Sequence, residues 1–210
     1  MNNTFYARPK PATVAGWVAA TPPDFRFVVK AQRGASVRAL YGDPAESVTW
    51  MLEPLGGFGA RLGAVLWRIP DPIPRDDGRL AGLLGAWPRD VPLVIEAQDP
   101  SWHVDETFTA LRVANAVLCT TDLDECAAPP DIRRTGSSLY LRLRRTGYSD
   151  ADLDTWARRI APFVADGMDA YVLFRHDEDG RSGLHAEGFA ARVARELGEA
   201  PGDESGRRVG

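Results

Sequence analysis

The chain has 210 residues, 44% of them hydrophobic and 26% charged, which suits a water-soluble α/β domain with a sizeable core. Its formal net charge of −4 provides no general positive field, so we expect neither nucleic acid nor an anionic membrane surface as a partner. No apolar run approaches the length of a membrane span, and no basic-then-apolar signal pattern opens the sequence.

Strand and helix patterns alternate along the chain with short connections. The opening residues, Met1 to Tyr6, start abruptly, as if partway through a strand, and the polar, glycine-rich residues 199–210 predict a disordered C-terminal tail. Apolar segments predict strands over residues 25–31, 64–69, 93–97, 116–120, 138–143 and 170–174. Helical spacing predicts helices over residues 44–55, 79–87, 104–114, 150–166 and about 186–197.

Capping residues mark the start of two of these helices. Asp43 precedes Pro44 as an N-cap, and Ser149 with Asp152 forms a capping-box pattern. Pro162 is expected to kink the helix that follows Ser149 near its end.

The repeated strand-then-helix order and the continuously apolar strands predict a parallel sheet covered by helices. An open doubly wound sheet and a (β/α) barrel both fit this order. No Gly-x-Gly-x-x-Gly or Walker A run opens a helix, which weakens the doubly wound interpretation. Charged residues at the ends of several separate strands favour the barrel, because their side chains would converge on one mouth.

These strand-end residues form the candidate site. Alternation along each strand predicts that one set of side chains points into the barrel: Val28 and Lys30; Val94, Glu96 and Gln98; Tyr140, Arg142 and Arg144; and Val172, Phe174 and His176.

Two residues are candidates for moving a proton. Glu96 would be a general base if burial raises its pKa, or it forms an internal ion pair with Arg142 or Lys30. His176 is the histidine placed at a predicted strand end, although the acidic residues after it also fit an exposed turn.

The remaining candidates would bind substrate. Lys30 and Arg142 would hold a phosphate or carboxylate, or they neutralise Glu96 and Asp122. Asp122 would orient a hydroxyl group, or it caps the following turn. Trp102 would stack on a ligand or pack over the barrel rim, and Tyr148 would reach over the mouth.

We expect no cofactor and no metal, since no tight ligand spacing is present. Cys119 and Cys126 resemble neither a disulfide framework nor a C-x-x-C pair, which predicts a reduced, cytoplasmic protein.

Several segments of the chain carry a family resemblance: Thr4-Phe5-Tyr6, residues 17–31, Glu96 with Pro100-Ser101-Trp102, Tyr140-Leu141-Arg142-Leu143, Tyr148-Ser149-Asp150 with Leu153 and Trp156, and Tyr171-Val172-Leu173-Phe174. Together they resemble the YecE-like family, a bacterial domain of unknown function numbered seventy-two. The resemblance implies a TIM-type (β/α)8 barrel and names no activity. We therefore expect one barrel domain over residues 1–198, followed by the tail.

The chain departs from this family in two ways. The family has a further strand–helix unit and a full second strand whose end corresponds to Asn2 through Tyr6, so the resemblance implies an incomplete barrel. An upstream start, a partner chain (a homo-oligomer covering the open edge) or a rearranged open barrel would each account for this. Strand-end polar residues usual in the family are also replaced, at Arg68, Ala97, Gln98, Asp99, Arg144, Arg145, Arg175 and His176.

Two functions remain open from the sequence. The first is a small-molecule enzyme that acts on a polar or anionic, sugar- or phosphate-bearing substrate at the carboxyl-end mouth of the barrel. The second is a diverged, non-catalytic barrel that binds a ligand or a protein partner.

Overall fold

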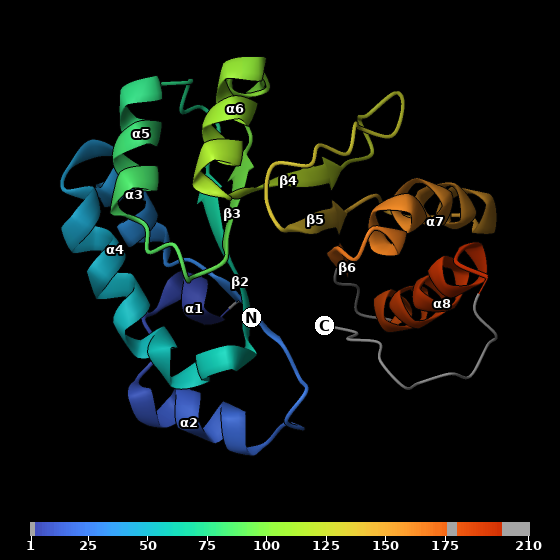
Figure 1. The fold of residues 1–210 in the computed structure, drawn as a ribbon, viewed down its shortest axis with the longest axis horizontal. Helices are drawn as coiled ribbons and strands as arrows, with labels where there is room; N and C mark the ends of the chain where they lie inside the picture. Colours follow the sequence, from blue (N-terminus) through green and yellow to red (C-terminus); the bar gives the residue numbers. More distant parts are fainter. Residues whose placement is uncertain (1–2, 176–179, 199–210) are drawn as a thin grey trace.

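The computed structural model describes residues 3–175 and 180–198, and within them six parallel strands form one sheet in sequential order (Figure 1). The strands are β1 (Phe27–Lys30), β2 (Leu62–Ile69), β3 (Leu93–Ala97), β4 (Val117–Asp122), β5 (Ser138–Leu143) and β6 (Asp169–Phe174). Sequential order agrees with the barrel interpretation, because each strand is followed by the neighbour that a barrel requires.

The helices are α1 (Asn3–Tyr6), α2 (Pro11–Ala19), α3 (Arg33–Tyr41), α4 (Pro44–Leu52), α5 (Asp77–Ala86), α6 (Asp105–Ala114), α7 (Asp150–Ala165) and α8 (Arg181–Glu196), with 3-10 turns η1 (Glu53–Arg61) and η2 (Pro100–Trp102). Those that follow strands lie on the convex side of the sheet, whereas α1 and α2 precede β1, and α1 lies against the end of that strand. In Figure 1, α3 to α6 lie beside the first four strands, whereas α7 and α8 lie beside β5 and β6.

The sequence-predicted caps are confirmed. The Asp43 side chain accepts a hydrogen bond from the Glu46 backbone N–H at 3.0 Å, directly before Pro44. Ser149 and Asp152 make both bonds of a capping box at the start of α7. These bonds satisfy N–H groups that the first turn of a helix leaves unpaired.

Two sequence predictions for the first third of the chain were wrong. Residues 3–6 form the helical turn α1 instead of the end of a strand, and the Thr4 hydroxyl of this turn donates to the Lys30 carbonyl at 2.7 Å. A strand's backbone there would need a paired neighbour, whereas the short turn lies against the end of β1. The helix α3 was not predicted, because its apolar residues are few and its Gln32 cap is an uncommon one.

The sheet curls into a half-barrel with apolar side chains on both faces. On the convex face two clusters pack against the helices, one containing Val65, Trp67 and Ile95 and the other containing Leu141 and Leu143. The concave face carries a smaller cluster built from alternate positions: Ala64, Leu66, Val94, Val117, Cys119, Tyr140 and Tyr171. The described residues thus form an α/β fold with a six-stranded parallel half-barrel, which is consistent with the incomplete barrel expected from the sequence.

Close approach across the concave face shows how strongly the sheet curls. A Cβ atom added at Gly63, in β2, would lie 2.7 Å from the hydroxyl oxygen of Tyr171, in β6. Glycine is needed there because any larger side chain would collide with this tyrosine.

The prediction of which strand side chains point to the concave face is confirmed for β1, β3 and β5 and is wrong for β6. Lys30, Glu96 and Arg142 share the parity of the residues in the concave cluster, whereas Val172 and Phe174 pack with the α7–α8 cluster. The β5–β6 register explains the error, because it places Phe174 beside Leu143, which also faces the helices. His176 and the predicted tail at 199–210 lie outside the described residues.

The strands β3 and β4 pair over only a few residues, and this limited pairing positions the candidate site. Only Val94 and Ile95 of β3 pair with β4, through Val117 and Leu118, and from Cys119 onward β4 pairs with β5. The Leu118 backbone N–H donates instead to the Thr135 hydroxyl at 2.7 Å, in the loop after β4. The carboxyl end of β3 therefore separates from β4, and the sheet has a gap there.

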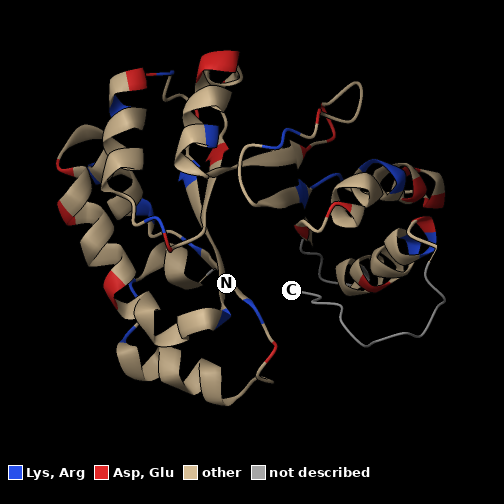
Figure 2. Cartoon of the chain, viewed as in Figure 1, with Lys and Arg blue, Asp and Glu red and all other residues tan. Residues whose placement is uncertain are grey.

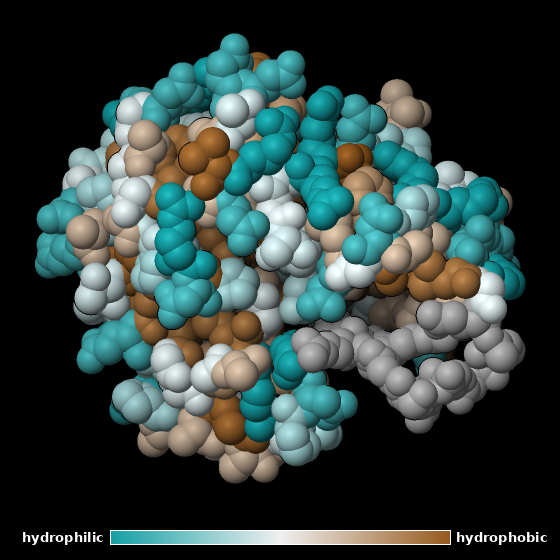
Figure 3. All heavy atoms as spheres, in the orientation of Figure 1, coloured by the Kyte–Doolittle hydropathy of each residue, from teal (hydrophilic) through white to brown (hydrophobic). Residues whose placement is uncertain are grey.

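Charged residues of both signs are spread over the molecule and alternate on α7 and α8 (Figure 2). On the face drawn in Figure 3, hydrophobic residues appear in groups among hydrophilic ones. Among the helices that the structure describes, none is both long and apolar enough to cross a membrane.

Candidate functional site

Glu96 is the centre of a charged cluster at the carboxyl ends of the strands. It lies near the end of β3, its side chain is 3% exposed, and one carboxylate oxygen accepts a short hydrogen bond from Arg142 of β5. The other oxygen, Oε2, lies 3.7 Å from Nε of Arg68 in β2 but has no hydrogen bond. The carboxylate is thus paired by charge and retains one oxygen that can accept a hydrogen bond.

Two further cations face this cluster without an anionic partner among the described residues. Lys30 lies with its Nζ 4.0 Å from the centre of the Phe5 ring in α1, a cation–π contact. Burial and the neighbouring Arg142 and Arg68 lower the pKa of Lys30 below its ordinary value. Burial, followed by the charge of Arg142, also lowers the pKa of Arg144, which makes no ion pair or hydrogen bond through its side chain within the part of the chain described.

The cluster therefore carries an excess of positive charge. The charges acting on Lys30 are those of Arg142, Arg68, Arg144 and Glu96, so four cations with one carboxylate leave three positive charges in excess. Partly buried cations are held near one another only at a cost, because water screens their repulsion poorly there. An anion bound between them would relieve that repulsion.

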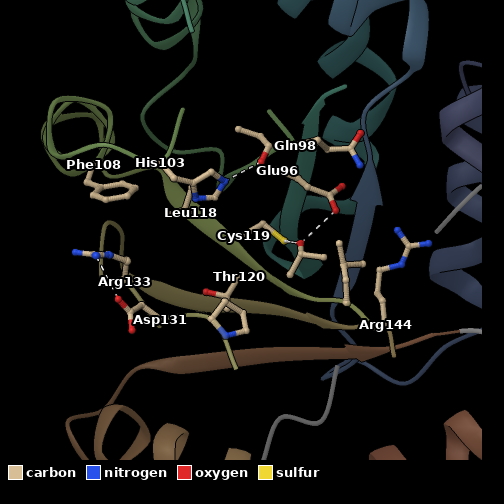
Figure 4. Close-up of a pocket in the computed structure, with 14 residues that line it drawn as sticks. Glu96, Gln98, His103, Phe108, Leu118, Cys119, Thr120, Asp131, Arg133 and Arg144 are labelled. Carbon is tan, nitrogen blue, oxygen red and sulfur yellow. Dashed lines mark hydrogen bonds and ion pairs between the residues drawn. The ribbon is translucent and has the colours of Figure 1, made fainter. Parts of the chain in front are cut away.

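A cavity of about 360 Å³ opens from this cluster through the gap between β3 and β4 (Figure 4). Consecutive residues of β4, from Leu118 to Thr121, line it, so the cavity reaches past both faces of this strand. Figure 4 shows Glu96 and Arg144 toward one end, and Phe108, Asp131 and Arg133 toward the other. The gap in the sheet thus connects the charged cluster with the convex side.

A short chain of polar side chains runs from the cavity wall to Glu96. The Thr121 hydroxyl donates to Glu96 Oε1 at 3.4 Å, and Cys119 Sγ lies 3.5 Å from the same hydroxyl. Burial raises the pKa of the Cys119 thiol to about 12. This cysteine is therefore a neutral wall residue at ordinary pH and not a nucleophile.

Asp122 lies on the other face of the sheet, away from Glu96. Its fully buried carboxylate accepts hydrogen bonds from Arg145 Nε at 3.0 Å, the Tyr148 hydroxyl at 3.0 Å and Trp156 Nε1 at 3.3 Å. Its backbone carbonyl accepts from the Arg144 N–H at 2.9 Å. These bonds show that Asp122 holds the loop after β5.

The other predicted binding residues also have structural contacts. Trp102 is 1% exposed, packs in the convex cluster and donates from Nε1 to the Ile73 carbonyl at 2.8 Å. Tyr148 donates to Asp122, and its ring meets Phe174 edge-on. Of the sequence candidates, the structure brings together Lys30, Glu96 and Arg142, while Asp122, Trp102 and Tyr148 lie outside this cluster.

Sequence reasoning did not assign a binding role to Arg68, Arg144, Thr120 or Thr121. Arg68 follows Ala64 and Leu66 at alternate positions of β2, so strand parity alone could have placed it beside Glu96. Thr120 and Thr121 carry no comparable signal, because their role depends on the separation of β3 from β4.

No group of three or more His, Cys, Asp or Glu side chains is arranged to hold a metal ion within residues 3–175 and 180–198. The charged cluster has a single carboxylate and four cations, a set suited to an anion.

Comparison with known proteins identifies the class of this half-barrel. The family model described as "Protein of unknown function DUF72" matches residues 1–206, and the chain belongs to this family, which is the YecE-like family.

Two solved structures show the same fold. A DUF72 family protein from Enterococcus faecalis has 21% identity and a TM-score of 0.75, with 95% of this chain and 89% of that chain covered. A DUF72 family protein from Thermotoga maritima has 23% identity and a TM-score of 0.74, with 89% of this chain and 80% of that chain covered. No curated protein sequence matches the chain.

Proposed function

We propose that this protein binds a small anionic molecule, bearing a phosphate or carboxylate group, at the carboxyl-end rim of the half-barrel. The observation that carries the proposal is the excess of positive charge around Glu96, where Lys30 and Arg144 form no ion pair with any described residue and share the single nearby carboxylate with Arg142 and Arg68. Their ammonium and guanidinium groups suit phosphate and carboxylate oxygens.

Glu96 has two roles in this proposal. Its pairing with Arg142 and Arg68 holds both guanidinium groups at the rim. Its Oε2 atom, which has no hydrogen bond, is the group that would accept a proton from a bound substrate if the protein is an enzyme. His176, the second proton-transfer candidate from the sequence, keeps that role as a hypothesis.

A non-catalytic binding protein is the second candidate. The same pairing of Glu96 favours it, because the ion pairs with Arg142 and Arg68 give this carboxylate a structural role without any catalytic one. Both candidate functions use the same anion site, and they differ only in whether the protein converts the bound molecule.

Titration calorimetry with inorganic phosphate tests the anion site. Wild type should bind phosphate, and Arg144→Gln should weaken binding about tenfold, a loss of about 1.4 kcal/mol. Arg112→Gln, which changes an exposed arginine on α6, is the matched control and should leave the affinity unchanged. Equal affinities for wild type and Arg144→Gln would remove the proposed site.

Glu96→Gln then separates the two candidates. Incubation of wild type with a panel of phosphorylated metabolites should reveal turnover if the protein is an enzyme, and Glu96→Gln should abolish that turnover while anion binding persists. Turnover that survives this substitution would exclude Glu96 as the proton acceptor.

A further inference from the structure

The cavity extends well beyond the charged cluster, so its volume indicates the size of the ligand that it could hold. A volume of about 360 Å³ lies within the range of small-molecule pockets, roughly 300–1,000 Å³, and exceeds what a lone phosphate fills. The body of a ligand whose anionic group lies near Arg144 would therefore continue into the gap between β3 and β4.

The walls of this gap carry polar groups that are not fully bonded. Thr120 is 6% exposed, and its hydroxyl has no hydrogen-bond partner among the described residues. Glu96 Oε2 also has no hydrogen bond. Asp131, whose side chain is 79% exposed at the other end of the cavity, bonds Arg133 at 3.3 Å through one oxygen and can bond a ligand through the other. A buried polar atom without a partner, such as Glu96 Oε2, is uncommon in folded proteins and is explained well by a missing ligand.

The lining does not suit a flat aromatic body. The Phe108 ring is 3% exposed, and the Arg133 guanidinium lies 4.7 Å from its centre, so this phenyl group has no open face for stacking. Hydroxyl, carboxylate and amide groups from Thr120, Asp131 and Gln98 are instead complementary to the hydroxyl groups of a sugar or polyol.

We propose that the ligand is a phosphorylated sugar or polyol, whose phosphate lies at the rim beside Arg144 and whose hydroxylated body enters the gap between β3 and β4. This inference rests on the proposed anion site and specifies the class of molecule that occupies it. Thr120 and Asp131 recognise the body, and Arg144 recognises the phosphate.

Calorimetry on the full chain tests this assignment with three probes: inorganic phosphate, glucose phosphate and adenosine monophosphate. Wild type should bind glucose phosphate about tenfold more tightly than inorganic phosphate, which corresponds to the hydrogen bonds made by the body. Adenosine monophosphate should bind no better than inorganic phosphate.

Two variants locate the contacts with the body. Thr120→Val keeps the shape of a buried side chain and removes its hydroxyl, and Asp131→Asn keeps the shape of an exposed side chain and removes its charge. Each should reduce the preference for glucose phosphate without changing the affinity for inorganic phosphate. Asp24→Asn, in an exposed loop remote from the cavity lining, is the control.

The outcomes distinguish the two proposals. Equal affinities of wild type for glucose phosphate and inorganic phosphate would overturn the sugar assignment and leave the anion site standing, as would a preference for adenosine monophosphate. A preference unchanged in both Thr120→Val and Asp131→Asn would also overturn it. Failure of all three probes to bind would remove the anion site itself.

Discussion

Glu96 is the residue on which the rim cluster depends. Glu96→Gln removes the carboxylate that pairs with Arg142 and Arg68, whose side chains are 16% and 28% exposed. Breaking a buried ion pair from one side leaves uncompensated charge, so we expect a loss of about 3 kcal/mol in the free energy of unfolding. Urea denaturation measures it. Glu125→Gln, at an exposed position, is the control, and equal midpoints for the two variants would contradict the prediction.

The lowered pKa of Lys30 predicts how the affinity for anions depends on pH. Burial and the nearby arginines lower its pKa below 10.5, so in the folded protein it loses its charge at a lower pH than an exposed lysine does. Sulfate affinity should therefore fall as the pH rises toward 10.5, and Lys30→Arg should remove this fall because arginine stays charged.

The same shift has a stability consequence with a defined sign. Between the lowered pKa and the unfolded value of 10.5, the unfolded chain binds more protons, so the free energy of unfolding should rise with pH in that window. Lys10→Arg, at the N-cap of α2, is the matched control and should retain the wild-type pH profile. A wild-type profile as flat as that of Lys30→Arg would show that Lys30 does not contribute.

At the scale of single elements, Thr135 supplies the hydrogen-bond acceptor for a buried backbone N–H of β4. Its hydroxyl accepts the Leu118 backbone N–H at 2.7 Å in a buried position, where the strand ladder offers no partner. Thr135→Val would leave this N–H unpaired and should cost about 2 kcal/mol of stability by thermal or urea denaturation. Thr155→Val, which removes a solvent-exposed hydrogen bond in α7, should cost less than about 0.5 kcal/mol.

At the scale of the whole molecule, the strands of the half-barrel differ in their burial and in how many neighbouring strands they pair with. Every residue of β3 is buried and the strand pairs with both β2 and β4, whereas β6 is half-exposed and pairs with β5 alone in the described residues. Native-state hydrogen exchange should therefore show lower protection for β6 amides than for β3 amides. Equal protection would contradict an open edge at β6. Protection of β6 that rises with protein concentration would support the homo-oligomer expected from the sequence.

Much of the fold was predictable because it depends on local patterns. The strand β3 and the cap at Ser149 were placed correctly, since a continuous apolar run and a capping box act within a few residues. The turn α1 was not, because residues 3–6 are helical only where Thr4 bonds the end of β1. The facing of β6 was also missed, since its register with β5 is a tertiary property.

The sequence by itself determined that Lys30, Glu96 and Arg142 lie late in separate parallel strands, because alternation and strand direction place them on one face and at one end. Alternation along β2 and β5 places Arg68 and Arg144 on that face as well. Only the tertiary structure decided the remaining contacts: Arg142 and Arg68 pair with Glu96, α1 brings Phe5 onto Lys30, and the separation of β3 from β4 opens the cavity beside Thr120. These contacts join residues that are far apart in the chain, so no local sequence pattern predicts them.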